Sequence, residues 1–472
     1  MSTANLLFCG MRILLYAALI AAGSITSIAQ QFRYEVYDED HTPWHVHKER
    51  RDRVVASLAP TSVAAVLAAD VRNRQNDVDF EYRQNSDLLY LTGCTEPGAV
   101  LLLSARGFRI GEKVHKEILF LRERNTAKEQ WVGPTMGPAE TVALLRIDTA
   151  LPLSKLAEIL DSCLSTTDTV FVSSMPTKSV TVPLAQRNLY TDGNLRTWLR
   201  EKNPKIVLRT SMPLLAALRE VKDTSELRLL QKAIDISVDG HYAMMRGARP
   251  GMREYELEAL IEYTFKALGA EDVGYPSIVG SNYNACILHY TTNRRATRMG
   301  ELVLADCGAE YHGYTADITR TFPLSGTFTA EQRKIYAIVL EAQDSGIAAS
   351  RVGSPFSAPD AAARSVVARR LMELGITSKT EEASRYFMHG TSHYLGLDVH
   401  DPGTGGPLKA NSVITVEPGI YIPEGSPCDK RWWNIGVRIE DDILVTPAGP
   451  INMSARLVRS IEEIEAVVGK AP

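Results

Sequence analysis

The sequence from residue 302 to residue 322, LVLADCGAEYHGYTADITRTF, contains two apolar runs, and each run carries an aspartate. The first run leads into Asp306, and the second starts at Asp317 and continues to Phe322. Both runs have the length and apolar character of buried β-strands. A carboxylate that is buried without a partner costs a great deal of free energy. Each aspartate therefore requires a cation or a close set of hydrogen-bond donors.

Strand-like runs with acidic residues recur towards the C-terminal end of the chain. Val413–Glu417 and Ile435–Glu440 each end in a glutamate, Ile443–Thr446 is a further apolar run, and His393 precedes all three. Taken singly, an aspartate at a strand end more often caps a loop than binds a metal, and a lone histidine is usually an ordinary polar group. Taken together, four carboxylates carry more negative charge than one basic residue can offset, whereas two divalent cations would offset it.

The types of ligand narrow the choice of metal. The candidate metal ligands are Asp306, Asp317, His393, Glu417 and Glu440. Oxygen-rich ligation with one imidazole suits Mn²⁺, Co²⁺ or Zn²⁺ better than an ion that prefers thiolates, and we favour Mn²⁺. Two such ions about 3.5 Å apart can share a hydroxide, because the pKa of bound water falls from ~15.7 towards ~7. The sequence contains no G-x-S-x-G nucleophile motif that would compete with this chemistry.

Four further polar residues are candidates for catalysis. Residues two apart on a strand project to the same face, so we expect Arg438 to lie beside Glu440 and to hydrogen-bond a ligating carboxylate. His289, His389 and His400 lie in polar segments near the candidate ligands, where they could bind substrate or transfer protons near neutral pH. Gly390, between His389 and His393, argues against a helical pair of metal-binding histidines like that of H-E-x-x-H.

The patterns predict two domains of different type. In the first half, strand-like runs at 63–67, 99–103, 118–121 and 170–173 alternate with amphipathic stretches, which is typical of an α/β layer. The second half begins with a helix after Asp223, which has capping-box spacing to Glu226, and a second helix follows from about Glu254. Helical patterns return at 330–350 and 358–374, so the second half is α+β. A polar break at 202–205 separates an N-terminal domain over 31–210 from a C-terminal domain over 218–472.

Residues 1–30 have the pattern of a secretory signal peptide. Arg12 precedes an apolar run from Ile13 to Ala22, and small residues follow at Ser27 and Ala29. The run is too short to span a bilayer comfortably, so we expect no stable membrane anchor. The sequence predicts a secreted or periplasmic protein, and a start at Met11 would still leave the whole apolar run in place.

Composition excludes several other classes of protein. The chain has 472 residues, 45% of them hydrophobic and 23% charged, which is typical of globular domains. A formal net charge of -4 gives no electrostatic case for nucleic-acid binding. The 6 cysteines are scattered without a C-x-x-C pair, so neither a zinc ribbon nor a disulfide framework is encoded. A small ligand is the expected partner.

Six sequence blocks resemble the motifs of the pita-bread metallopeptidases, and they follow one another in the same order. The blocks are Ile287-Leu288-His289-Tyr290, Leu304-Ala305-Asp306-Cys307-Gly308-Ala309, Asp317-Ile318-Thr319-Arg320-Thr321-Phe322-Pro323, His389-Gly390-Thr391-Ser392-His393, Val416-Glu417-Pro418-Gly419 and Arg438-Ile439-Glu440-Asp441-Asp442. The resemblance implies a C-terminal pita-bread catalytic domain preceded by a smaller α/β domain. The segment 82–93 and the ending 461–465 are similar to aminopeptidase P, also called Xaa-Pro aminopeptidase.

The resemblance also implies roles for the candidate residues. Asp317 and Glu440 match ligands that bridge both metal ions, His393 and Glu417 match ligands of one ion, and Asp306 matches a ligand of the other. Glu417 also matches the general base, and the three histidines 289, 389 and 400 match residues that line the substrate site. The implied reaction is release of the N-terminal residue from peptides with proline in second position, by attack of a hydroxide that bridges two divalent metals.

Three rival functions remain open at this point. Prolidase cleaves only the Xaa-Pro dipeptide, a creatinase-like hydrolase uses the fold without metals, and a peptidase-like domain of histone chaperones only binds. The complete ligand set and the predicted signal peptide argue against the last two. We also expect a homo-oligomer, a dimer or tetramer. Leu89 stands where relatives often carry a large aromatic that helps cover a neighbouring subunit's site, so this departure leaves the closure over substrate and the contact between subunits open.

Overall fold

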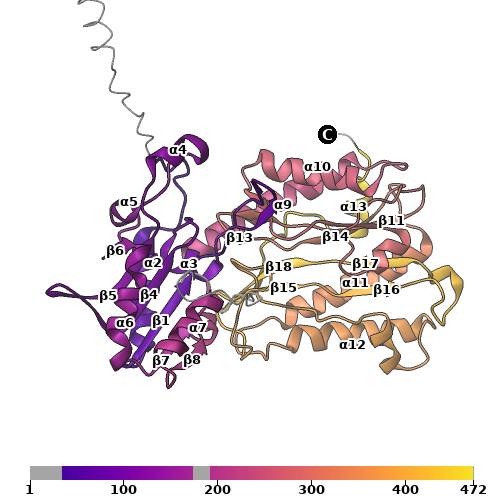
Figure 1. Ribbon diagram of the computed structural model, residues 1–472. Coiled ribbons are helices and arrows are strands. Elements are labelled where there is room, and N and C mark those ends of the chain that lie inside the picture. The colour runs from indigo at the N-terminus through magenta and orange to yellow at the C-terminus, as the bar shows by residue number, and fades with distance from the viewer. Residues whose placement is uncertain (1–33, 174–191, 471–472) are drawn as a thin grey trace, which may run out of the picture.

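The computed structural model describes residues 34–173 and 192–470, which form a smaller N-terminal domain and a larger C-terminal domain (Figure 1). The predicted signal peptide, residues 1–30, lies outside the described residues. Among the helices of the described ranges, none has the length and apolarity required to cross a membrane.

The N-terminal domain is built on one mixed sheet of six strands. The order is β6 (Ala150–Pro152), β5 (Lys113–Leu121), β4 (Val100–Ile110), β1 (Ser62–Leu67), β7 (Thr169–Val172) and β8 (Val207–Thr210). The central strand β1 is buried at all six residues, pairs antiparallel with β4 and pairs parallel with β7. The four strands predicted in this half are confirmed as β1, β4, β5 and β7, because apolar runs buried on both faces are a strong strand signal.

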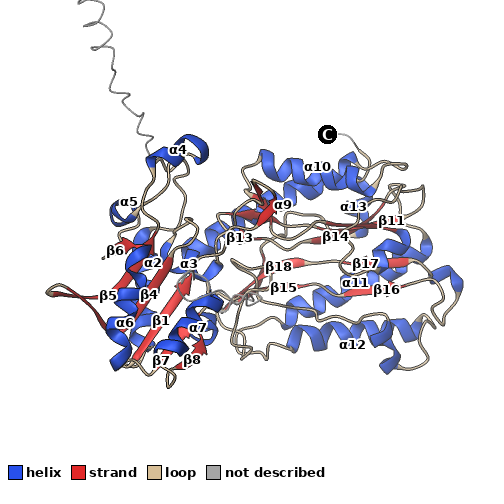
Figure 2. Cartoon of the chain, in the orientation of Figure 1, coloured by secondary structure: helices blue, strands red, loops and turns tan. Residues whose placement is uncertain are grey.

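Helices pack around this sheet (Figure 2), and a small hairpin forms a separate two-stranded sheet. The elements are α2 (Trp44–Ser57), the hairpin of β2 (Asn73–Gln75) and β3 (Val78–Asp79), α3 (Ser86–Thr92), α4 (Thr126–Val132), α5 (Pro138–Leu144), α6 (Leu156–Cys163), α7 (Asp192–Lys202) and α8 (Met212–Arg219). The helix α8 follows β8 directly and leads into the C-terminal domain.

The C-terminal domain places its longer strands between two pairs of helices (Figures 1 and 2). One pair is α9 (Thr224–Gly247) and α10 (Glu254–Ala267), and the other is α11 (Ala330–Ala349) and α12 (Ala358–Glu373), with α13 (Ile461–Val467) near the end of the chain. The predicted capping box is present at the start of α9, where Asp223 accepts from the backbone N–H of Glu226 and Glu226 accepts from that of Asp223. All four predicted helices of this half are confirmed.

Several short ladders of strands occupy the space between the helix pairs. They are β10 (Ile278–Ser281), β11 (Leu302–Asp306) and β14 (Thr319–Pro323); β15 (Val413–Val416), β18 (Asp441–Thr446) and β19 (Gly449–Asn452); β16 (Gly419–Ile422) with β17 (Ile435–Arg438); and β13 (Tyr314–Thr315), β12 (Ala309–Tyr311) and β9 (Asp272–Val273). In the first ladder Asp306 pairs with Thr319, and in the second Val416 pairs with Asp441.

A buried ion pair joins the first two of these ladders. Arg320 of β14 and Asp441 of β18 are both fully buried, and their side chains meet at 2.6 Å. The guanidinium of Arg320 also donates to the backbone carbonyl of Glu440, and the backbone N–H of Glu440 donates to the carbonyl of Thr319. These contacts hold the start of β14 against the start of β18, where the acidic residues gather.

Two acidic residues lie just outside strands rather than in them. The strand predicted over 435–440 ends at Arg438 as β17, so Glu440 lies in the short connection to β18. Asp317 precedes β14, which begins at Thr319 instead of 317. Leaving the ladder frees both side chains from the strict alternation of a pleated strand.

Candidate metal centre

The structure brings the five predicted metal ligands together where the ladders of β14 and β18 meet. Asp306 ends β11, Asp317 precedes β14, His393 lies in the loop before β15, Glu417 follows β15, and Glu440 precedes β18. Asp306, Asp317 and Glu440 are 8%, 5% and 1% exposed. So many buried carboxylates in one place require positive charge nearby.

Three of the five residues already have the spacing of a metal site. Asp317, His393 and Glu440 offer ligand atoms that all lie within 4.8 Å of one another. Nε2 of His393 is 3.3 Å from Oδ2 of Asp317 and 3.5 Å from Oε1 of Glu417. Ligand atoms that share one ion through bonds of about 2.0–2.2 Å lie about 3–4.4 Å apart. The spacing therefore fits a cation held between these side chains.

His393 is oriented as a metal-binding histidine requires. Its Nδ1 lies 3.0 Å from the backbone carbonyl of Tyr394, an acceptor that fixes the proton on Nδ1. Nε2, the other ring nitrogen, points to Asp317 and Glu417, and it is the atom that a metal would bind. A ring nitrogen fixed in this way by a backbone carbonyl is the usual outer contact of a histidine ligand.

A tyrosine that the sequence reasoning missed connects the two aspartates. The hydroxyl of Tyr275 lies 2.6 Å from Oδ1 of Asp306 and 2.7 Å from Oδ1 of Asp317. Tyr275 lies in the loop between β9 and β10, about 30 residues before Asp306 in the chain. An isolated tyrosine in a loop has no periodic signal, so only the folded topology reveals its role. The hydroxyl fixes the orientation of both carboxylates.

Arg438 contacts a different carboxylate from the one that we expected. Because β17 ends at Arg438, the pleat does not place Glu440 beside it. The guanidinium instead donates to Oδ2 of Asp306 at 2.6 Å and to Oγ1 of Thr319 at 3.1 Å. The hydroxyl of Thr319 in turn donates to Glu440 at 2.6 Å. Arg438 therefore orients Asp306 directly and reaches Glu440 only through Thr319.

His389 is connected to Arg438 through Tyr421, a second tyrosine that the sequence reasoning missed. Nη1 of Arg438 donates to the hydroxyl of Tyr421 at 2.9 Å, and that hydroxyl lies 2.8 Å from Nε2 of His389. Nδ1 of His389 is 3.6 Å from Oε2 of Glu417. Burial and then the charge of Arg438 lower the pKa of His389 to about 4, so this ring is neutral near pH 7.

His400 and His289 lie on the open side of the centre. The ring of His400 is 4.2 Å from that of His393, centroid to centroid. Burial, then the charge of His393, lowers the pKa of His400, and the charge of His289 contributes to the same shift. His289 itself is exposed. The structure thus places His400 beside His393, and His289 is close enough to His400 to influence its pKa.

Ion pairs with the linker and the N-terminal domain hold the loop that carries His400. Arg219, at the end of α8, is paired with Asp398 at 2.8 Å and with Asp401 at 2.5 Å. Nζ of Lys222 donates to the other oxygen of Asp401 at 3.0 Å. The side chains of Arg219, Lys222 and Asp401 are almost fully buried. The position of His400 therefore depends on charges supplied from outside the strand ladders.

The electrostatics of the centre favour a bound cation. Burial raises the pKa of Glu417 to about 8. Burial and the charges of Asp317 and Glu417 raise the pKa of Glu440 well above its ordinary value, and burial raises that of Asp306. The donor set of carboxylates and one imidazole fits Mn²⁺, Co²⁺ or Zn²⁺. Positive charge from divalent ions would allow all of these carboxylates to ionise together.

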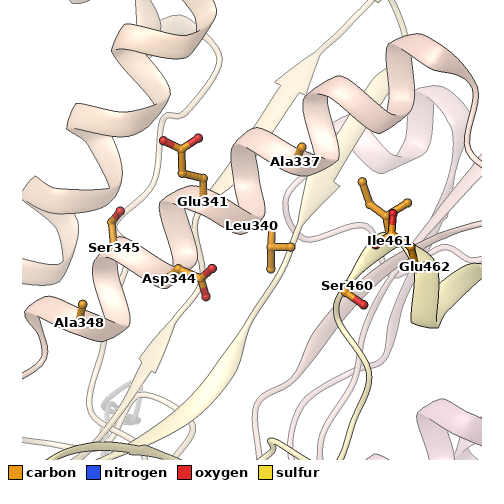
Figure 3. Close-up of a pocket in the computed structure, with 9 residues that line it drawn as sticks. All are labelled: Ala337, Leu340, Glu341, Asp344, Ser345, Ala348, Ser460, Ile461 and Glu462. Carbon is orange, nitrogen blue, oxygen red and sulfur yellow. The ribbon is translucent and has the colours of Figure 1, made fainter.

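A separate surface hollow of about 470 Å³ contains none of these residues. It lies between α11 and the start of α13, and Glu341, Asp344 and Glu462 contribute its charged lining (Figure 3). Glu341 is paired with Arg369 and Arg370, and Asp344 is paired with Arg459. Its charges are thus already paired, and the carboxylate centre remains the candidate site.

A buried centre of carboxylates and one imidazole, set between strand ladders and flanked by helix pairs, is the donor set of a metallohydrolase. Comparison with known proteins agrees. The family model of metallopeptidase family M24 matches residues 228–447, and that of the N-terminal domain of aminopeptidase P matches residues 47–171. The Xaa-Pro aminopeptidase of Escherichia coli strain K12 is 36% identical over 437 residues, which cover 89% of this chain and 97% of that protein.

Solved structures give the same result. Aminopeptidase P from E. coli with the inhibitor Pro-Leu superposes with a TM-score of 0.81 at 35% identity, and the match covers 90% of this chain and 98% of that one. The zinc-substituted E. coli enzyme in complex with product has the same TM-score, identity and coverage. The chain belongs to metallopeptidase family M24, with the aminopeptidase P type of N-terminal domain. It is a hydrolase that depends on a divalent metal.

Proposed function

We propose that the protein is a Xaa-Pro aminopeptidase, which removes the N-terminal residue from peptides that have proline in second position. The observation that carries the proposal is the convergence of five metal-binding side chains in one buried centre. The similarity to a Xaa-Pro aminopeptidase over 97% of that relative's length supports it. The relative whose structure contains Pro-Leu supports a substrate with proline in the same way.

The centre holds two divalent ions in this proposal. Asp306, Asp317, His393, Glu417 and Glu440 would hold these ions. Mn²⁺ is the favoured ion because oxygen ligands dominate the set. Divalent ions bound here supply a hydroxide nucleophile near neutral pH by lowering the pKa of water.

The remaining residues prepare the centre for catalysis. Tyr275 and Arg438 hold Asp306 in one orientation through contacts of 2.6 Å each. Glu417 is the group that accepts a proton during attack, since it lies beside His393 at the open side of the centre. His289, His389 and His400 bind the scissile peptide in this proposal, and an imidazole N–H aimed at the carbonyl would stabilise the charge that develops there.

Proline selectivity follows from the chemistry of the substrate. The bond before proline is a tertiary amide that has no N–H. A protease that requires that N–H as a hydrogen-bond donor cannot bind such a peptide. A site that instead surrounds the pyrrolidine ring and presents an ion-activated water to the carbonyl has no need of the donor.

Hydrolysis of a matched peptide series tests the proposal. The purified protein is treated with a chelator, loaded with Mn²⁺ or left unloaded, and given Xaa-Pro dipeptides, Xaa-Pro-Yaa tripeptides and Xaa-Ala-Yaa controls. We expect Mn²⁺-dependent release of Xaa from the proline tripeptides and little from the alanine controls. Cleavage of the dipeptides alone would assign prolidase activity instead.

The location and the assembly of the protein are part of the same proposal. The basic, apolar and small residues of segment 12–29 support export, so mature protein from its host should begin near Gln30 or Gln31. Recovery of the intact chain from the cytoplasm would contradict export.

We also propose a dimer or tetramer, and light scattering of the purified protein measures its mass directly.

A further inference from the structure

A second cluster of side chains that can bind a metal lies where the N-terminal arm meets the catalytic domain. The arm is the segment 34–42, which precedes α2. Asp38 and His41 of this arm and His312 of the catalytic domain offer ligand atoms that all lie within 4.8 Å of one another. Because His312 lies in the turn between β12 and β13, the cluster joins two distant parts of the sequence.

The orientation of His312 is that of a metal ligand with an outer carboxylate. Nδ1 of His312 is 2.7 Å from Oε1 of Glu271, and the backbone N–H of His312 donates to Oε2 of the same carboxylate at 2.8 Å. This double contact fixes the ring, so Nε2 points to the arm, where Oδ1 of Asp40 lies at 2.8 Å. A histidine held by a carboxylate through one nitrogen is the usual arrangement around zinc.

The backbone conformation at His312 indicates that this position has a histidine for the sake of its side chain. His312 has a φ of 49°, in the left-handed region, and Gly313 follows with a φ of 81°. Turns between antiparallel strands use such conformations, and glycine or asparagine adopts them at lower cost than a histidine does. A histidine here therefore makes the turn less stable than glycine or asparagine would, but it places an imidazole opposite the arm.

The two arm residues are free to bind an ion. Among the described residues, neither Asp38 nor the ring of His41 makes a hydrogen bond, although the His41 and His312 rings lie 4.1 Å apart. Both residues face solvent, so an ion can enter without unfolding.

We propose that Asp38, His41 and His312 bind one divalent transition-metal ion, with Asp40 as the fourth ligand, and that this ion fastens the arm to the catalytic domain. Two imidazoles with carboxylates favour Zn²⁺, Co²⁺, Ni²⁺ or Cu²⁺ over Mg²⁺ or Ca²⁺. The ligand atoms of a tetrahedral site with bonds of about 2.0–2.2 Å lie about 3.3–3.6 Å apart. Small side-chain rotations would bring the three ligand atoms from their present separation of up to 4.8 Å to this spacing.

Zinc counting on the full chain tests this site independently of catalysis. Wild type and His41→Ala are saturated with Zn²⁺, desalted and measured by plasma mass spectrometry. His45→Ala is the matched control, since His45 is an exposed histidine of the same region on α2. We expect His41→Ala to hold one ion fewer than wild type and than His45→Ala. The same difference should persist in an Asp317→Asn background, where the catalytic centre is impaired.

Two further variants separate an ion site from an ordinary ion pair. Glu271→Gln leaves one acceptor oxygen, which cannot serve both the backbone N–H and Nδ1 of His312, and we expect about 10–100-fold weaker Zn²⁺ binding at the arm. Hydrogen exchange in segment 36–42 should slow when Zn²⁺ is added to wild type, and it should not respond in His41→Ala. Equal zinc content in wild type and His41→Ala, with exchange insensitive to Zn²⁺, would overturn the proposal and leave His312 as an ion-paired residue only.

Discussion

At the scale of single residues, Asp317 is the position in the centre where we expect a substitution to have the largest effect. It lies within reach of His393 and of Tyr275, and Asp317→Asn keeps its size while it removes the charge that two cations would share. We expect the variant to lose bound metal and turnover together. Its metal affinity should fall by more than the roughly 10–100-fold that removal of an outer contact usually costs. Metal analysis and peptide hydrolysis measure the two effects.

Asp344→Asn is a matched control for that variant, because Asp344 is an aspartate of α11 that is paired, among the described residues, with Arg459 alone. It should keep metal and activity. Full turnover of Asp317→Asn with wild-type metal content would remove Asp317 from the ligand set.

Tyr275 tests the same centre from outside the ligand set. Tyr275→Phe retains the ring and removes the hydroxyl that contacts Asp306 and Asp317. We predict that the variant folds normally and binds metal about 10–100-fold more weakly, because both carboxylates lose the contact that orients them. Excess metal should then restore most of the turnover. Unchanged metal affinity in a titration would show that Arg438 alone orients Asp306.

The histidines divide into a ligand and residues that face substrate. His289→Ala should keep the metal and reduce turnover by about 10²–10³, the usual cost of one donor to a developing charge. His393→Ala should instead weaken metal binding, because Nε2 of His393 points at Asp317 and Glu417. Metal content and turnover are compared for both variants. The opposite result, with metal lost from His289→Ala and kept in His393→Ala, would reverse the two roles.

At the scale of elements, the ion pairs of α8 with the His400 loop give a test based on pH. Burial alone would raise the pKa of Asp401, but the charges of Arg219 and Lys222 outweigh it and hold that pKa below the ordinary value. A depressed carboxyl pKa contributes stability that is complete above the unfolded pKa, about 3.9, and is lost as the pH falls through the folded value.

Asp401→Asn should therefore destabilise the fold at pH 7 by about 3–5 kcal/mol, because it leaves Arg219 and Lys222 as buried charges without full compensation. The variant should also lose the part of the acid dependence that Asp401 supplies below about pH 4. Urea unfolding at pH 7 and at pH 3 measures both effects. A difference from wild type that is equally large at the two values would show that Asp401 does not titrate in this way.

At the scale of the whole molecule, bound metal and folding stability should be linked. A metal that binds the folded chain and not the unfolded chain stabilises it by about 2.7 kcal/mol when its free concentration is 100 times the dissociation constant. Chelation should thus lower the unfolding temperature, and added Mn²⁺ should restore it. Asp317→Asn should show little of this response. If neither chelator nor Mn²⁺ changed the unfolding temperature of the wild type, the result would contradict the proposal that the folded protein binds metal.

Much of this architecture is predictable from sequence patterns, because long apolar runs and capped amphipathic helices are local signals. The strands at 63–67 and 302–306 and the helix after Asp223 are of this kind. The partners of the carboxylates are not local. Tyr275 and Tyr421 are single residues without any pattern, and the contact of Arg438 with Asp306 depends on where β17 ends. Such contacts are fixed by the pairing of segments far apart in the chain.

The spread of the centre along the chain has a consequence for synthesis. Its side chains come from segments between Tyr275 and Glu440, and the final carboxylate lies after β17. A ribosome that has not yet translated residue 440 carries a chain that lacks one of the proposed bridging ligands. We therefore expect nascent chains, and fragments that end before this point, to be inactive as peptidases. The order in which the residues are joined would then delay activity until almost the whole chain has been made.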